Sequence, residues 1–361
     1  MNVPKPRPST LTRREFVQAA ALLAAGGCAT RPCQLGPPIS LPVPAESVRP
    51  APLCQVAFSV TDLDRTHLWY QRTLGFLPSG GTWLFRGFIA STIQGIPDVV
   101  SNTKWLVDQQ SFRQLEMFEY ESPKPRPYNR RPNDIGYTVL GVHVADFDDA
   151  LRRLDDSGVR PLTEPIGAPG KRRVCVRDPE NVIVELMEDD PRQNGAGARP
   201  RPHVPVATRS ITLSVPDLDR SRRFFVETLG LEVEPDADRL HRHEHERLWG
   251  LEGAASEKLL LWADDFLIEL RRYTDPVGEP WPAGYRICDQ GPLNIAFGFR
   301  DRRHFNELYA RVIEAGYSSN SEPVSFPGWA VVYVNDDLCF SVELLLVRPL
   351  ADGFMGFEPE T

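Results

Sequence analysis

The stretch Ser59-Val60-Thr61-Asp62-Leu63-Asp64-Arg65 decides the fold, because the chain repeats it. It returns in the second half as Ser214-Val215-Pro216-Asp217-Leu218-Asp219-Arg220, and Thr73-Leu74-Gly75 returns at the same offset as Thr228-Leu229-Gly230. A weaker copy relates Val144-Ala145-Asp146-Phe147-Asp148 to Phe299-Arg300-Asp301-Arg302. Since a repeat shows which positions are equivalent, the sequence predicts four units arranged as two successive pairs.

Each unit has the same order of elements. An alternating strand comes first, and an Asp that can cap a helix follows it: Asp62, Asp146, Asp217 and Asp301. Each helix is expected to end at a Gly that can adopt a left-handed conformation: Gly75, Gly158, Gly230 and Gly316. Three further strands complete the unit, the last two joined by a tight turn. The predicted order is therefore strand, helix, three strands.

The bulk composition is that of a globular protein. The 361 residues are 41% hydrophobic and 25% charged, which is enough to bury the cores of two domains. The net charge of −8 excludes a nucleic-acid partner, which would require a basic face. It is compatible with a small-molecule ligand or substrate.

The N-terminal residues 1–28 have the pattern of an export signal. Thr12-Arg13-Arg14-Glu15-Phe16 is a twin-arginine motif, and the short apolar run that follows it fits a signal peptide. Ala25-Gly26-Gly27-Cys28 resembles a lipoprotein cleavage site. We therefore expect a periplasmic protein or a lipoprotein, touching a membrane only through a lipid on Cys28. Cleavage near Ala29 without lipidation is the alternative.

Residues 29–50 are rich in proline and predict an extended tether. Beyond it, the four remaining cysteines have no paired spacing: Cys54, Cys175, Cys288 and Cys339. We interpret them as free thiols. The alternative is that some of them form a disulfide, if the protein resides in an oxidising compartment.

The repeated pattern resembles the vicinal oxygen chelate superfamily, which includes glyoxalase I, bleomycin-resistance proteins and extradiol dioxygenases. The resemblance covers residues 51–190 and 206–348, with a linker at 191–205 and a tail at 349–361. It implies an α+β fold with four βαβββ units in two tandem domains. It also implies that the two units of each domain close one cup.

The resemblance implies metal ligands on the first and last strand of each unit. The first-strand positions are Gln55, Val139, Ser210 and Asn294, and the last-strand positions are Glu116, Glu185, Glu269 and Glu343. Each Glu lies between apolar neighbours, so strand alternation sends the Glu into the cup if the neighbours pack under the helices. There a buried carboxylate requires a cation, a donor or a proton, unless the cup is open and wet.

In domain one this implies a site for a divalent ion at Gln55, Glu116 and Glu185, which could bind Mg²⁺, Mn²⁺, Ni²⁺ or Zn²⁺. A cup without metal is an equally good interpretation. Domain two offers Ser210, Glu269, Asn294 and Glu343. Neither domain has the two His and one carboxylate of ferrous oxygenases, which argues against a dioxygenase.

The chemistry implied for domain one is enolate formation. The metal would polarise two neighbouring oxygens of a small substrate, and Glu116 or Glu185 would move the proton. His143 shares the strand face of Val139 and is a further candidate at the edge of the cup. We expect an exported, metal-dependent isomerase, epimerase or lyase. The alternative is a metal-free protein that binds and sequesters a small molecule.

The histidines of the segment His241-Arg242-His243-Glu244-His245 alternate with other residues. All three would share a face of a strand and could bind metal. Because they precede Leu248-Trp249-Gly250 in an expected loop or helix start, we interpret them as a surface cluster.

Overall fold

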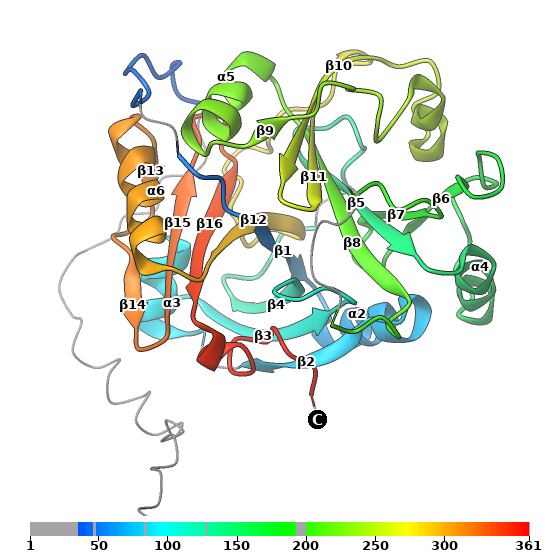
Figure 1. Ribbon diagram of the computed structural model, residues 1–361, viewed down its shortest axis with the longest axis horizontal. Coiled ribbons are helices and arrows are strands. Elements are labelled where there is room, and N and C mark those ends of the chain that lie inside the picture. The colour runs from blue at the N-terminus through cyan, green and yellow to red at the C-terminus, as the bar shows by residue number, and fades with distance from the viewer. Residues whose placement is uncertain (1–34, 46–47, 83–84, 128, 193–199, 361) are drawn as a thin grey trace, which may run out of the picture.

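The computed structural model describes residues 35–45, 48–82, 85–127, 129–192 and 200–360 (Figure 1). The export signal and Cys28 lie outside these residues and stay predictions. Among the described residues, no helix is long and apolar enough to cross a bilayer.

The first half of the chain holds two units. The first consists of β1 (Leu53–Val60), α2 (Leu63–Trp69), the π-helical turn η1 (Tyr70–Leu74), β2 (Leu77–Thr82), α3 (Gly87–Gln94), β3 (Val100–Val107) and β4 (Gln114–Ser122). The second consists of β5 (Gly136–Val144), α4 (Phe147–Asp156), β6 (Arg173–Arg177) and β7 (Ile183–Met187).

The second half repeats this order. The third unit consists of β8 (Val206–Ser214), α5 (Leu218–Arg222), η2 (Arg223–Thr228), β9 (Glu232–Val233), η3 (His243–Trp249), β10 (Ala255–Ala263) and β11 (Phe266–Asp275). The fourth consists of β12 (Gly291–Phe299), α6 (Arg302–Glu314), β13 (Ser318–Ser319), β14 (Val324–Phe326), β15 (Trp329–Asn335) and β16 (Ser341–Val347), followed by η4 (Pro349–Ala351). The α+β class and the four units are confirmed. The expected three strands after each helix differ in detail, because unit two has two described strands after α4 and unit four has four after α6.

The predicted helix boundaries are also confirmed. Each capping Asp accepts a hydrogen bond from the backbone N–H three residues further on, which satisfies a free donor of the first turn. The four terminal glycines all have positive φ, where a side chain would be strained.

The pairing of the units differs from the expectation. One sheet has the order β13-β15-β16-β12-β1-β4-β3-β2, with β14 on β15, and the other has the order β6-β7-β5-β8-β11-β10-β9. Unit one therefore pairs with unit four, and unit two with unit three. The expectation that units one and two share a cup is wrong, because the strands that meet are β1 with β12 and β5 with β8.

Close backbone approach explains part of this pairing. A side chain at Gly298 of β12 would lie 2.7 Å from the Cβ of Cys54 on β1. A side chain at Gly141 of β5 would lie 2.0 Å from the Oγ of Ser210 on β8. Each interface is therefore tight at one glycine, a feature that strand periodicity alone does not reveal.

The main core lies between the backs of the two sheets and the helices. Along β4, Leu115 and Met117 belong to this core, whereas Glu116 between them faces the other way. The opposite faces are concave, and we call them cup A (units one and four) and cup B (units two and three). Both cups are covered: α3 and the tail after β16 pack over cup A, and η3 packs over cup B.

The predicted tether is held against the body of the protein where it is described. The backbone N–H of Ile39 donates to Asp337 at 3.3 Å, and Arg220 donates to the carbonyl of Gly36 at 2.9 Å. The side chains of Ile39, Val43 and Val48 pack on the main core. The described residues 35–45 and 48–50 have no helix or strand, as expected of a tether, but they pack against the body of the protein.

Candidate functional site

Cup A is built around a local twofold relationship between β1 and β12. Gln55 lies opposite Ala296, and Asn294 lies opposite Ala57 in the antiparallel register. The two amide side chains, one from each half of the chain, are therefore symmetry-related.

The same symmetry relates two carboxylates in cup A. Glu116 pairs in register with Ala57, and Glu343 with Ala296, on the strands that flank the central pair. The two glutamates are buried, each 4% exposed. Four oxygen-bearing side chains thus face one cup: Gln55, Glu116, Asn294 and Glu343.

Glu116 is held by two donors. Trp105 of β3 donates its Nε1–H to Oε1 at 2.8 Å, and the amide of Gln55 donates to Oε2. Gln114 in turn donates to Gln55 Oε1 at 2.9 Å. Burial nevertheless raises the pKa of Glu116 to about 8, which the two donors only partly offset.

Glu343 is less constrained. Its Oε2 and both amide atoms of Asn294 have no hydrogen-bond partner among the described residues. Burial raises the pKa of Glu343 well above its ordinary value, and the charge of Glu116 raises it further. Tyr333 and Asn294, which lie beside the carboxyl, lower it without offsetting these two causes. Buried polar atoms of this kind are expensive unless something else binds them.

The walls of cup A are apolar. A cavity of about 20 Å³ lies over the polar floor, which is room for a water molecule or an ion but not for a substrate. No Lys, Arg or His is among the described residues that line it. Its lining comprises Gln55, Phe85, Ile93, Gln114, Glu116, Phe118, Trp329, Val331, Tyr333, Glu343, Leu345 and Met355.

The donor set of cup A suits a hard divalent cation. It offers two carboxylates and two amide oxygens, and Oε2 of Glu343 and Oδ1 of Asn294 are oxygen atoms that could bind such an ion. Within the described residues, no three His, Cys, Asp or Glu side chains are grouped to hold a metal. Cup A could therefore hold a metal only with amide oxygens among the ligands, which favours Mg²⁺ or Mn²⁺ over Zn²⁺ or Ni²⁺.

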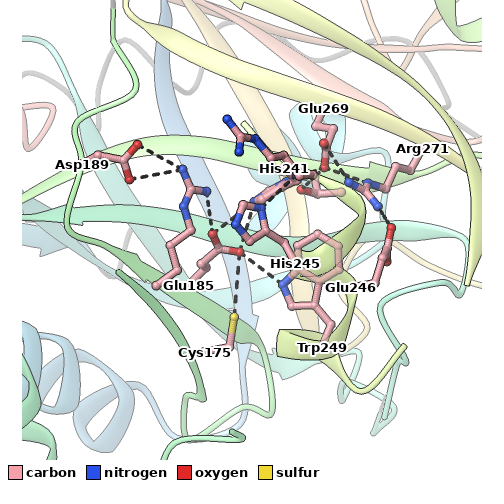
Figure 2. A network of polar contacts seen from close by, with 12 residues as sticks. Cys175, Glu185, Asp189, His241, His245, Glu246, Trp249, Glu269 and Arg271 are labelled. Atoms are coloured by element: carbon pink, nitrogen blue, oxygen red, sulfur yellow. Dashed lines mark hydrogen bonds and ion pairs between the residues drawn. The ribbon is translucent and has the colours of Figure 1, made fainter. Parts of the chain in front are cut away.

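Cup B has two carboxylates at the equivalent positions but is filled by its own side chains (Figure 2). Glu185 of β7 and Glu269 of β11 pair in register with the inner strands β5 and β8. His241, which lies just before η3, places Nε2 3.2 Å from Glu185 Oε1 and Nδ1 2.8 Å from Glu269 Oε2. The imidazole is 1% exposed.

Arginines and an indole complete the contacts of the cup B carboxylates. Arg173 donates to Glu185 Oε1 at 2.9 Å, and Trp249 Nε1 donates to Glu185 Oε2 at 3.2 Å. Arg271 donates to both oxygens of Glu269, at 3.0 and 3.1 Å. Arg271 also forms an ion pair with Glu246 of η3 (Figure 2).

The charges in cup B stabilise one another. Despite burial, His241 and Arg173 lower the pKa of Glu185 to about 2, and Arg271 and His241 lower the pKa of Glu269. The two carboxylates outweigh burial and raise the pKa of His241. The network is therefore ionised, in contrast to cup A.

The predicted metal set of Gln55, Glu116 and Glu185 is not brought together. Gln55 and Glu116 lie in cup A, whereas Glu185 lies in cup B, because the units pair across the two halves. Asn294 and Glu343, expected in the other domain, complete cup A.

The remaining predicted residues belong to sheet B. Ser210 lies on β8, and Val139 of β5 packs against Trp249. His143 is half-buried on β5, with Nδ1 3.3 Å from the carbonyl oxygen of Met187, so it is not part of cup A.

The interpretation of the three histidines as a surface cluster is wrong for His241 and correct for His243, which is exposed. The roles of His241, Arg271 and Trp105 are not predicted from the sequence. The position of Arg271, two residues after Glu269 on the same strand face, was a signal that could have revealed an internal ion pair.

Comparisons with known proteins agree with this architecture. Residues 54–176 match the family model described as the glyoxalase/bleomycin resistance protein/dioxygenase superfamily. Maize (Zea mays) glyoxalase I is a similar solved structure, with 16% identity, a TM-score of 0.53, and coverage of 84% of this chain and 94% of that chain. A comparison with curated proteins finds no match.

A second similar structure is a Bacillus subtilis protein whose assignment as a dioxygenase is itself provisional. It has 13% identity and a TM-score of 0.58, and the alignment covers 87% of this chain and 92% of that chain. At these identities the likeness shows the fold alone. The resemblance to the vicinal oxygen chelate superfamily is confirmed, by the family match over residues 54–176 and by the fold over most of the chain.

Proposed function

We propose that this protein is a divalent-metal-dependent isomerase or lyase of the glyoxalase kind, with its active site in cup A. The observation that carries this proposal is the symmetric arrangement of Glu116 and Glu343 with Gln55 and Asn294 in a buried cup. In this assignment Asn294 and Glu343 replace Glu185 in the predicted metal set.

The four side chains of cup A would hold the ion: Gln55, Glu116, Asn294 and Glu343. A bound divalent ion would polarise two neighbouring oxygens of the substrate and stabilise the charge of an enolate. Glu116, which Trp105 and Gln55 hold in place by hydrogen bonds, would be the most firmly positioned of these ligands.

Glu343 is the better candidate for the general base. Because its Oε2 accepts no hydrogen bond from the described residues, this oxygen is free to take a proton from the carbon next to the substrate carbonyl. Its raised pKa makes it a stronger base than an ordinary carboxylate. Tyr333, whose side chain lies close to Glu343, is placed to orient the carboxylate.

The walls of cup A indicate the class of substrate. Phe85, Phe118, Trp329 and Leu345 offer apolar surface, and the described lining contains no cationic side chain. An anionic substrate would therefore meet two carboxylates without a protein counter-charge. We infer a small uncharged molecule that has an apolar or aromatic body and two neighbouring oxygens. Met355 and Ile93 must shift to admit it, because the cavity holds only about 20 Å³.

The raised pKa values in cup A also support a second candidate function. Without metal, protonated Glu116 and Glu343 could donate hydrogen bonds to a ligand with an apolar body. The protein would then bind and sequester a small molecule without converting it.

A single experiment separates the two functions. The purified protein is stripped of metal, and turnover of phenylglyoxal-type α-dicarbonyls and aromatic α-hydroxyketones is measured with and without Mn²⁺. Activity that requires Mn²⁺ and is lost in Glu343→Gln supports the enzyme. Tight ligand binding in EDTA with no turnover under any metal would contradict it and favour the binding protein.

Export by the twin-arginine route, with a lipid on Cys28, is also part of this proposal. The interpretation of Cys339 as a free thiol is wrong, because Cys339 is disulfide-bonded. Disulfides persist in oxidising compartments, which supports a location outside the cytoplasm. Cys54, Cys175 and Cys288 are free and buried. Fractionation of cells that express the full chain, with a Cys28→Ala control, tests the anchor.

A further inference from the structure

Cup B contains the same pair of carboxylates as cup A in a different electrostatic state. In cup B, Glu185 and Glu269 occupy the positions that Glu116 and Glu343 occupy in cup A, so the charges around their oxygens decide whether a metal ion could bind there. Glu185 Oε1 accepts from Arg173 and Oε2 from Trp249. Glu269 accepts from Arg271 on both oxygens. Among the described residues, Glu116 in cup A accepts hydrogen bonds only from neutral donors, whereas Glu185 and Glu269 both accept from cationic arginines.

His241 lies where the two carboxylates converge. Both of its ring nitrogens face a carboxylate, at 2.8 Å on one side and 3.2 Å on the other. A neutral imidazole can donate from only one nitrogen, so both contacts are favourable only when the ring carries two protons and a positive charge. Figure 2 shows the ring between Glu185 and Glu269, with Trp249 beside it.

The first strands of cup B, β5 and β8, supply no side chains that could bind a metal in the way that Gln55 and Asn294 could in cup A. Val139 is apolar and packs with Trp249 and Leu248. Ser210 points at the backbone of Gly141, which has no room for a side chain. The donor set that a divalent ion would need is therefore incomplete, and its two carboxylates are already bound by protein cations.

We infer that cup B is a metal-free module in which the side chain of His241 takes the place of the divalent ion. The imidazolium joins Glu185 of unit two to Glu269 of unit three, so it holds the two units together as a metal would. Of the two cups that the described residues form, only cup A then remains as a metal site. This inference does not depend on the activity proposed for cup A.

Titration of the purified protein with Mn²⁺, followed by electron paramagnetic resonance, tests the inference in the parent. We expect at most one bound ion, with affinity unchanged by Glu269→Gln in a variant that remains folded. Loss of a bound Mn²⁺ ion in Glu269→Gln, with the cup A ion retained, would overturn the inference. A parent that binds no Mn²⁺ at all would count against cup A and agree with an ion-free cup B.

Removal of the His241 imidazole should create a metal site in cup B. In a Glu116→Gln background, which removes a ligand from cup A, His241→Ala should gain one Mn²⁺ ion, and addition of Glu269→Gln should abolish it. His243→Ala is the matched control, because His243 is exposed in the same segment. A folded His241→Ala protein that gains no ion would contradict the replacement. The parent titration decides the question if His241→Ala does not fold.

Discussion

Glu116 of β4 and Glu343 of β16 come from opposite halves of the chain and occupy equivalent positions in one buried cup. Their strands flank the central pair β1 and β12 on either side. The charge of Glu116 adds to burial in raising the pKa of Glu343. Glu185 and Glu269, the equivalent pair in the other cup, have lowered pKa values because His241 and two arginines surround them. The buried carboxylates are therefore favoured in the protonated form in cup A and in the ionised form in cup B.

Glu343→Gln should stabilise the metal-free protein in a pH-dependent manner. A carboxyl whose pKa is raised on folding contributes its full stability below the ordinary value of 4.5 and loses it as pH rises through the folded value. In EDTA at pH 8 we expect Glu343→Gln to raise the free energy of unfolding by about 1–3 kcal/mol, the typical cost of a buried polar group without a partner. Little gain is expected at pH 5.

Thermal unfolding at the two pH values measures this difference. Glu314→Gln on the exposed face of α6 is the control, and it should change neither melting temperature. A gain for Glu343→Gln that is equal at pH 5 and pH 8 would show that ionisation of this group is not the cause.

Trp105→Phe should weaken metal binding in cup A. The substitution removes the Nε1–H that donates to Glu116 at 2.8 Å and retains an aromatic ring. Loss of a hydrogen bond that orients a ligand typically costs about 10- to 100-fold in metal affinity. Mn²⁺ titration gives the dissociation constant. Trp329→Phe, which alters the wall of the same cup, should keep the parent affinity. Equal effects of both variants would refute the role of the indole N–H.

His241→Asn should destabilise the protein most at mildly acidic pH. The raised pKa of His241 means that its charge contributes fully below pH 6.5, and that this contribution is lost as pH rises through the folded value. Glu185 and Glu269 face its ring, and Arg173 and Arg271 pair with those two carboxylates. His245 lies beside the ring, and Lys258 donates to the His241 carbonyl oxygen. We expect a loss of about 3–5 kcal/mol at pH 6, as for one partner of a buried ion pair.

The difference between parent and His241→Asn should narrow in alkaline buffer, because the parent then also lacks the charge. Urea unfolding at pH 6 and at pH 9 measures it, with His243→Asn as the exposed control. A difference that widens with pH would contradict an imidazolium in cup B.

Met355→Ala should open cup A to larger molecules. Met355 lines the cavity from the C-terminal tail and is 8% exposed, so its truncation enlarges the space above Glu116 and Glu343. We expect the uncharged apolar dye Nile red to bind more tightly to the variant than to the parent. Phe354→Ala, at an exposed neighbouring position, should bind the dye as the parent does. No change in Met355→Ala would show that the tail does not restrict entry.

Much of the fold is predictable because its signals are local. The capping Asp and the terminal Gly of each unit act on hydrogen bonds and φ angles within a few residues, so the sequence shows them directly. The alternation around Glu116 and Glu343 likewise predicts which face of each strand they occupy. Both kinds of prediction are confirmed.

The pairing of units is not predictable in this way. Four similar units can associate in several combinations that satisfy the same strand periodicity, and the choice depends on long-range contacts such as Gly298 against Cys54. His241 was misjudged for a related reason: its neighbours Arg242 and His243 are exposed, and only the tertiary fold brings Glu185 and Glu269 to it.

The most direct test of the account is the metal content of the protein, purified without chelator or His-tag, in the parent and in two variants. We predict about one divalent ion per chain by mass spectrometry, lost in Glu343→Gln and retained in Glu185→Gln. Retention in Glu343→Gln together with loss in Glu185→Gln would contradict the assignment of the site to cup A.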